Sequence, residues 1–192
     1  DKFEELLSPR TKLVSVTHIS NVLGTVLPIK EITRLAHVHD ALVLIDGAQG
    51  IMHSRVDVQD LDVDFYGFTG HKLYGPSGIG VLYGKRDILN SMPPYEGGGD
   101  MIDRVTFEKT TYRETPARFE AGTPAIVEAA GLAAAVDYVE SIGIERIAAH
   151  EKSLLDYATA RLSGIEGLRI YGEAEDKAGV ISFTIEGVHP HD

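Results

Sequence analysis

Two short segments of the chain each place a reactive side chain directly after an apolar run. Asp46 opens Asp-Gly-Ala-Gln after the run 41–45, and Lys72 closes Thr-Gly-His-Lys after the run 64–68. A desolvated lysine amine forms Schiff bases with carbonyl groups, and a carboxylate can keep a pyridine nitrogen protonated so that the ring absorbs electrons. Side by side, Lys72 and Asp46 predict a site for pyridoxal 5′-phosphate (PLP).

Three neighbouring side chains fit the same cofactor. Gln49 can donate a hydrogen bond to the phenolic oxygen of a ring whose nitrogen faces Asp46. Thr69 and His71 flank a glycine, and a hydroxyl and an imidazole beside a backbone N–H are suitable donors to a phosphate. These residues extend the predicted site from one ion pair to a cofactor cradle.

Each of these residues also has an ordinary structural interpretation. Asp46 can be a helix N-cap, His71 can belong to a turn, and an isolated lysine is usually a solvated charge. Asn21 follows another predicted strand, where it can form an Asx turn or bind a substrate carboxylate. The functional interpretation therefore depends on whether the fold brings the residues together.

Apolar periodicity predicts the elements that would position these side chains. Strands are expected at 12–17, 41–45, 64–68, 79–83, 169–171 and 180–185, and helices at 28–39, 57–61, 124–141 and 144–162. Residues 92–118 look irregular. Strands separated by helices indicate an α/β fold with a mainly parallel sheet flanked by helices, which binds ligands at the carboxyl ends of its strands.

The end of the chain has a different character from its centre. We expect residues 1–143 to form the central part of a PLP-binding large domain. Residues 144–192 are expected to supply a bridging helix and the start of a smaller, truncated α+β domain. Both ends look like interruptions of a longer protein.

The composition narrows the range of partners and locations. The 192 residues carry 18 basic and 29 acidic side chains, and this net charge of −11 argues against a nucleic-acid partner. There is no cysteine, the eight histidines show no His-Glu-x-x-His pattern, and no metal site is expected. With no apolar run of about 18 residues and no secretory signal, we expect a cytoplasmic protein without a membrane partner.

Four stretches together resemble a known family. They are HISNVLGTVLPI (18–29), DGAQGIMHSRVDVQDLDVDFYGFTGHKLYGPSGIGVLY (46–83), EGGGDMI (96–102) and RFEAGTP (118–124). The chain resembles the class V aminotransferase branch of the fold-type I PLP enzymes, and more narrowly the cysteine desulfurase and selenocysteine lyase group. The resemblance covers nearly the whole chain, and GHKLYGPSGIG with RFEAGTP is its most specific part.

The resemblance implies roles for individual residues. Lys72 resembles the lysine that holds PLP, Asp46 the partner of the pyridine nitrogen, and Gln49 the partner of the phenolic oxygen. Thr69 and His71 resemble phosphate ligands.

Two further roles follow from the same resemblance. Asn21 resembles a residue near the phenolic oxygen and the substrate carboxylate. Thr123 resembles a phosphate donor that reaches the neighbouring subunit's site, so a homodimer is implied.

The implied activity is PLP-dependent transfer of sulfur from L-cysteine to an enzyme cysteine, with a sulfur-acceptor protein and iron–sulfur cluster assembly downstream. The family's chain is longer at both ends, and it carries its nucleophilic cysteine and a carboxylate-binding arginine beyond the part seen here. This chain has no cysteine, so it is expected to be inactive alone. Selenocysteine lyase, another class V lyase or transaminase, and a non-catalytic fragment that only dimerises or binds a partner remain alternatives.

Overall fold

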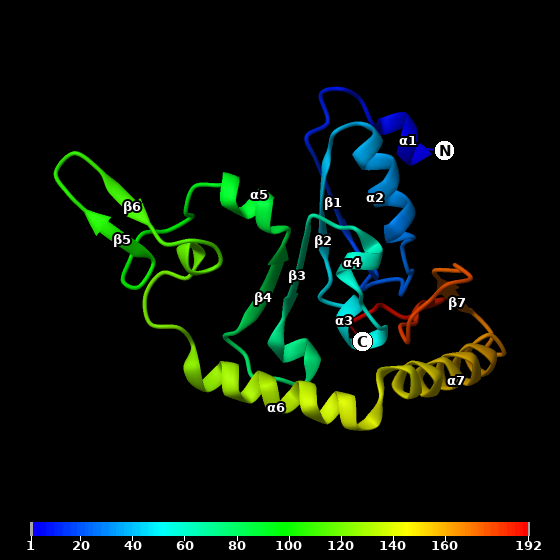
Figure 1. Ribbon diagram of the computed structural model, residues 1–192. Coiled ribbons are helices and arrows are strands. Elements are labelled where there is room, and N and C mark those ends of the chain that lie inside the picture. Colours follow the sequence, from blue (N-terminus) through cyan, green and yellow to red (C-terminus); the bar gives the residue numbers. More distant parts are fainter. Residues whose placement is uncertain (1, 192) are drawn as a thin grey trace.

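A four-stranded sheet forms the centre of the molecule in the computed structural model, which describes residues 2–191 (Figure 1). Asp1 and Asp192, the outer limits of the predicted division, lie outside the described residues. The strands are β1 (Leu13–Thr17), β2 (Leu42–Asp46), β3 (Phe65–Thr69) and β4 (Gly80–Gly84), in that spatial order. β1, β2 and β3 are parallel, and β4 is antiparallel to β3. The predicted mainly parallel α/β class is confirmed.

The connections explain these strand directions. Helix α2 (Ile29–Val38) lies between β1 and β2, and α3 (Gly50–His53) and α4 (Val58–Leu61) lie between β2 and β3. These crossovers return the chain to the same end of the sheet, as parallel strands require. Only the 3₁₀ turn η1 (Gly70–Leu73) and a short loop separate β3 from β4. Such a short link suits an antiparallel pair.

One face of the sheet packs on helices and forms the core. α2 starts after Pro28, whose fixed φ suits a helix start, and turns its apolar side to the strands. The core combines the apolar side of α2 with strand residues that alternate with less buried positions. Its buried members include Val14, Ile29, Ile32, Ala36, Val43, Ile45 and Tyr66. Figure 1 shows α2, α3 and α4 on this side.

The other face carries no buried residue within the described strands. It includes Leu13, which is 51% exposed, and Leu82, which is 63% exposed. Within residues 2–191 the helices therefore flank this sheet mainly on one side. Asp46 and Thr69 lie on the uncovered face, because side chains alternate along a strand and Asp46 pairs with Gly67.

The segment 92–118 is more ordered than its sequence predicts. After α5 (Arg86–Ser91), strands β5 (Ile102–Val105) and β6 (Thr110–Tyr112) form a hairpin, and a 3₁₀ turn η2 (Ala117–Phe119) follows. The expectation of an irregular segment was wrong here. The hairpin is short and largely exposed, so its sequence lacks the apolar alternation that marks a half-buried strand.

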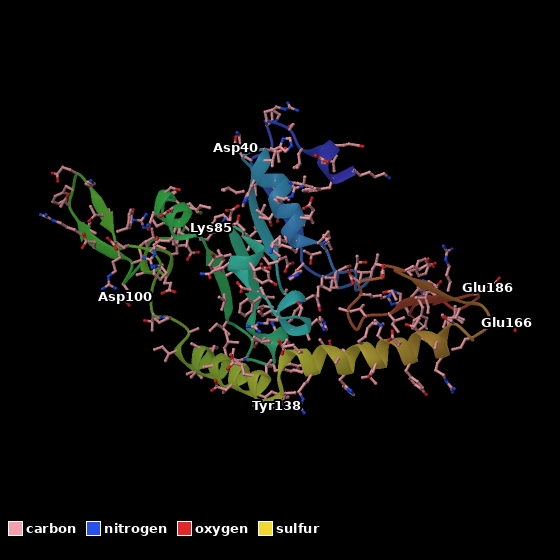
Figure 2. The ribbon with its side chains drawn as sticks, turned by 45° about the vertical axis from the view of Figure 1, so that its right-hand side comes forward. Asp40, Lys85, Asp100, Tyr138, Glu166 and Glu186 are labelled. Carbon is pink, nitrogen blue, oxygen red and sulfur yellow. The ribbon has the colours of Figure 1, made fainter. Side chains whose placement is uncertain are left out.

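Two long helices lead to the C-terminal hairpin. α6 (Ile126–Ile142) packs on η1, and Gly143, with φ of 91°, separates it from α7 (Ile144–Leu162). β7 (Leu168–Tyr171) and β8 (Ser182–Ile185) form a separate antiparallel pair. Figure 2 shows this pair, near Glu166 and Glu186, and the loop at Asp100 on opposite sides of the central sheet.

The first and last parts of the chain also meet. α1 (Lys2–Leu6) precedes β1, and the loop after β1 contacts the segment before β8 through Val26 N–H to Asp176 O (3.0 Å) and Ala178 N–H to Gly24 O (2.9 Å). A domain division at residue 143 stays a prediction. None of the helices within residues 2–191 is both long and apolar enough to cross a membrane.

Candidate active site

The carboxyl ends of β2 and β3 form the floor of the candidate site. Asp46 is the last residue of β2 and Thr69 the last of β3. Both line a hollow of about 340 Å³ on the uncovered face, together with Ser15, Leu44, Ile45, Ala48, Gly67 and Phe68. Asp46 is exposed, and its Oδ1 accepts a hydrogen bond from Ala48 N–H at 2.9 Å. This bond leaves Oδ2 available to a cationic ring nitrogen.

The turn η1 brings Lys72 to the same edge. η1 starts at Gly70, directly after β3, and ends at the buried Leu73, which packs with Leu132 of α6. Lys72 is half-buried between these anchors. The hydroxyl of Thr69 and Nδ1 of His71 lie 2.9 Å apart, so the two predicted phosphate donors form one pair.

Two further predicted residues, Gln49 and Asn21, lie in loops at the same edge of the sheet. Gln49 is the N-cap of α3, just after β2, and Asn21 lies exposed in the turn after β1. The loop that holds Asn21 is joined to β2 by the His18 N–H to Asp46 O bond of 2.8 Å. The structure thus gathers the loops after β1, β2 and β3 at one edge.

Thr123 does not belong to this group. It is exposed in the coil before α6, and no hydrogen bond among residues 2–191 joins it to Asp46 or Lys72. Its predicted reach into a neighbouring subunit stays a prediction.

A buried pair below the Asp46 loop was not recognised from the sequence. His18 Nδ1 and the Tyr66 hydroxyl lie 2.9 Å apart, and the side chains are almost fully buried. A Cβ on Gly47 would fall 1.9 Å from Tyr66 Cε1, and one on Gly50 would fall 2.5 Å from His18 Nδ1. The two glycines therefore allow the loop to lie directly on this pair, and their spacing was the available sequence signal.

The environment fixes the charge state of the pair. Burial lowers the pKa of His18. Burial, and to a lesser degree the Asp46 carboxylate, raises the pKa of Tyr66. A neutral imidazole and a protonated phenol thus support the loop.

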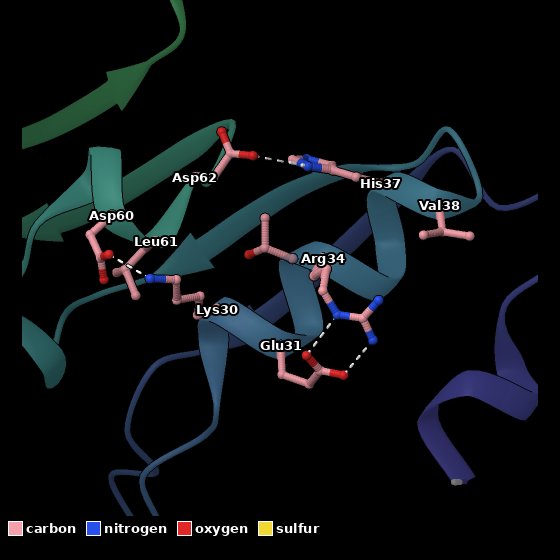
Figure 3. Close-up of a pocket in the computed structure, with 9 residues that line it drawn as sticks. Lys30, Glu31, Arg34, His37, Val38, Asp60, Leu61 and Asp62 are labelled. Atoms are coloured by element: carbon pink, nitrogen blue, oxygen red, sulfur yellow. Dashed lines mark hydrogen bonds and ion pairs between the residues drawn. The ribbon is translucent and has the colours of Figure 1, made fainter.

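A larger hollow of about 640 Å³ lies elsewhere, along α2 and beside α4 (Figure 3). Its charged side chains pair with one another: Lys30 with Asp60 at 2.5 Å and Arg34 with Glu31 at 2.6 Å. These pairs are exposed and fit a solvated surface. The residues predicted to bind the cofactor are instead at the carboxyl edge of the sheet.

The donor set at that edge fits PLP. It offers an exposed carboxylate and a hydroxyl that line the hollow, and an imidazole that is paired with this hydroxyl. An amide and a half-buried lysine follow in the turns after the same two strands. Within residues 2–191, no three His, Cys, Asp or Glu side chains gather as a metal site would require.

Sequence comparisons place the chain among PLP enzymes. The family model described as Aminotransferase class-V matches residues 1–192. A cysteine desulfurase of Synechococcus elongatus is 56% identical over 190 residues, which are 99% of this chain and 30% of that protein. A cysteine desulfurase of Dickeya dadantii is 55% identical over 97% of this chain and 45% of its own length. The chain thus spans less than half of these relatives.

Solved structures agree. The Escherichia coli cysteine desulfurase CsdA superposes with a TM-score of 0.93 at 39% identity, over 98% of this chain and 47% of that one. A mutant of C-DES, with glycine covalently linked to its PLP cofactor, superposes with a TM-score of 0.85 at 31% identity, over 95% of this chain and 49% of that one. The resemblance to the cysteine desulfurase group and the expected cofactor of the family are confirmed. Because the family match covers the whole sequence, the chain belongs to the PLP-dependent class V aminotransferase family.

Proposed function

We propose that the protein containing this chain is a PLP-dependent cysteine desulfurase. It would move the sulfur of L-cysteine to an enzyme thiol, so that the C–S bond breaks, a persulfide S–S bond forms and alanine leaves. The observation that carries the proposal is the placement of Asp46 and the Lys72 turn at the ends of adjacent parallel strands, beside one hollow. The identity to named cysteine desulfurases supports the choice of substrate.

Two residues of the chain would have catalytic roles. Bound PLP supplies an electron sink for bond breaking at the substrate carbons. Lys72 Nζ would hold the cofactor and then carry the proton taken from the substrate α-carbon. The Asp46 carboxylate would keep the ring nitrogen protonated.

Binding and orientation would fall to the neighbouring donors. Thr69 and His71 would bind the phosphate, and Gln49 would donate to the phenolic oxygen. Asn21 would lie near the substrate carboxylate. Thr123 would serve the site of a second subunit in a homodimer.

The sulfur-accepting thiol must come from outside these 192 residues, because the sequence contains no cysteine. The 192-residue chain alone would therefore be inactive. In the whole protein, the persulfide would pass to an acceptor protein, with iron–sulfur cluster assembly in the cytoplasm as the proposed destination.

Substitution of Lys72 tests this function. In the protein at its full natural length, Lys72→Ala should abolish alanine formation from L-cysteine and the visible absorbance of covalently held PLP. Asp46→Ala should retain bound PLP but lower turnover on the order of 10²-fold or more, because the ring loses its protonating partner. Lys12→Ala, an exposed lysine before β1, is the matched control and should change neither property. Wild-type turnover by Lys72→Ala would refute the proposal.

A C–S lyase is the second candidate. C-DES, described as a cystine C–S lyase in complex with its product cysteine persulfide, superposes with a TM-score of 0.85 at 32% identity, over 95% of this chain and 50% of that one. A selenocysteine lyase would share the same floor. Products distinguish the three: alanine with sulfur from cysteine, alanine with selenium from selenocysteine, or cysteine persulfide from cystine.

A further inference from the structure

His53 lies between the loop after β2 and helix α7. It is the last residue of α3, and its side chain is 10% exposed. Its Nε2 lies 3.2 Å from Gln49 Oε1, and its Nδ1 lies 2.7 Å from Glu151 Oε2. One imidazole thus connects a predicted cofactor ligand to a carboxylate that is 98 residues further along the chain.

The two contacts favour a hydrogen on each nitrogen of the imidazole. In the orientation that the Gln49 amide has here, both partner atoms are oxygens that accept, and a ring with an N–H at each nitrogen satisfies both contacts. The Glu151 carboxylate balances the charge of this doubly protonated imidazole. Glu151 is 26% exposed, so the pair is shielded from solvent more than an ordinary surface ion pair.

The two lysines near this pair bind other groups. Lys152 and Lys177 line the same small hollow of about 180 Å³ as His53 and Glu151. Lys152 Nζ contacts Asp156 at 2.5 Å, and Lys177 Nζ donates to Gly172 O at 2.8 Å. Glu151 therefore remains the partner of His53.

This geometry has a consequence for Gln49. When its Oε1 accepts from His53, the side-chain NH₂ is the group left to face a ligand. A neutral imidazole with its only hydrogen toward Glu151 would favour the reversed amide, which presents an oxygen instead. The phenolic oxygen of PLP, when ionised, needs a donor.

We propose that His53, held by Glu151, is a positioning residue that orients the Gln49 amide with its NH₂ group toward the cofactor. The inference rests on the proposed function. It makes α7 part of the support of the site, since the orienting carboxylate comes from that helix.

Two isosteric substitutions separate positioning from simple packing. In His53→Gln the side-chain amide lies where Nε2 of the imidazole was, so the variant keeps a donor to Gln49 and loses the Glu151 contact. Asparagine mimics Nδ1, so His53→Asn keeps the Glu151 contact and gives up the one to Gln49. Their PLP dissociation constants and their unfolding midpoints without PLP should be measured in the full-length protein.

Positioning predicts that His53→Asn weakens PLP binding about tenfold, while His53→Gln stays within about threefold of wild type. A role limited to joining α3 and α7 predicts the reverse order. Equal or reversed effects on the PLP dissociation constants would overturn the inference. A wild-type protein that fails to bind PLP would overturn the proposed function, and this inference with it.

Glu151→Gln provides an independent variant on the outer side of the pair. It should weaken PLP binding, and ¹⁵N spectra of cofactor-free protein should show that His53 changes from two protonated ring nitrogens to one. Glu145→Gln, on the same helix and 68% exposed, is the matched control and should leave affinity and spectra unchanged. Unchanged PLP affinity in Glu151→Gln, or a singly protonated His53 in wild type, would contradict the proposal.

Discussion

Gly47 has no side chain, and this allows the Asp46 loop to lie directly against the buried Tyr66 ring. Because a Cβ there would fall 1.9 Å from Tyr66 Cε1, Gly47→Ala must displace the ring or the loop. Overpacking of this kind costs about 1–3 kcal/mol. We expect a loss of unfolding free energy in this range, measured by urea denaturation, together with weaker PLP binding.

The control for this substitution is Gly97→Ala. A Cβ at Gly97 would meet nothing within 4 Å, so this change should leave the unfolding free energy within about 0.5 kcal/mol of wild type. Equal destabilisation by both substitutions would show that the Tyr66 contact is not the cause.

Residue types and spacing were sufficient to predict which residues lie at the carboxyl edge of the sheet: Asp46, Gln49, Thr69, His71 and Lys72. Each follows a recognisable strand, and parallel strands end on the same side. The chemical roles of these residues stay predictions. His53 and Glu151 could not be found in this way, because contacts across such a sequence distance leave no local pattern.

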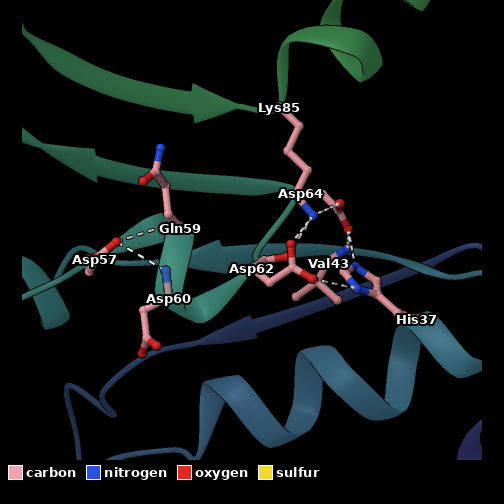
Figure 4. Close-up of polar contacts among 8 residues, drawn as sticks. All are labelled: His37, Val43, Asp57, Gln59, Asp60, Asp62, Asp64 and Lys85. Atoms are coloured by element: carbon pink, nitrogen blue, oxygen red, sulfur yellow. Dashed lines mark hydrogen bonds and ion pairs between the residues drawn. The ribbon is translucent and has the colours of Figure 1, made fainter.

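At the scale of elements, a buried carboxylate joins three parts of the fold (Figure 4). Asp64, whose side chain is 4% exposed, accepts from Val43 N–H at 2.7 Å and contacts His37 Nε2 at 2.9 Å and Lys85 Nζ at 3.1 Å. These partners belong to β2, α2 and the loop after β4. Asp64→Asn should therefore lower the unfolding free energy by roughly 3 kcal/mol, since it removes one charge from a buried group. Urea denaturation measures the loss.

Asp62 supplies the comparison within the same cluster. A hydrogen bond from Lys85 lowers the pKa of Asp62, yet its side chain is 65% exposed. Asp62→Asn should cost less than about 1 kcal/mol, because water screens exposed pairs. If Asp62→Asn proved as costly as Asp64→Asn, burial would not explain the strength of the cluster.

Sequence patterns predicted the long elements well. The helix expected at 144–162 is found as α7 (Ile144–Leu162), and the expected strands match β1, β2, β3 and β4 within about one residue at each end. The β5–β6 hairpin was missed because few of its side chains are buried. The direction of β4 was not predicted, since it depends on the connection rather than on the strand's own residues.

At the scale of the whole molecule, residues 2–191 provide a site floor and leave one face of the sheet without buried side chains. In the proposed function this floor holds the cofactor and the substrate, and the sulfur acceptor comes from another part of the protein. Transfer of sulfur from cysteine needs a thiolate nucleophile, and the sequence contains no cysteine. The division at residue 143 and the homodimer stay predictions at this scale.

The 192-residue chain alone should therefore form no alanine from L-cysteine. The assay incubates the folded chain with PLP and L-cysteine, without added thiols, and compares alanine and sulfide with a PLP-only control. Circular dichroism confirms that the chain is folded, so that inactivity is not mistaken for unfolding. Each turnover must move one sulfur atom to a nucleophile, and the chain has no cysteine to provide one. Catalytic alanine above the control would therefore show that another acceptor, such as the thiol of a second L-cysteine, takes the sulfur, and the expectation that the chain alone is inactive would be wrong.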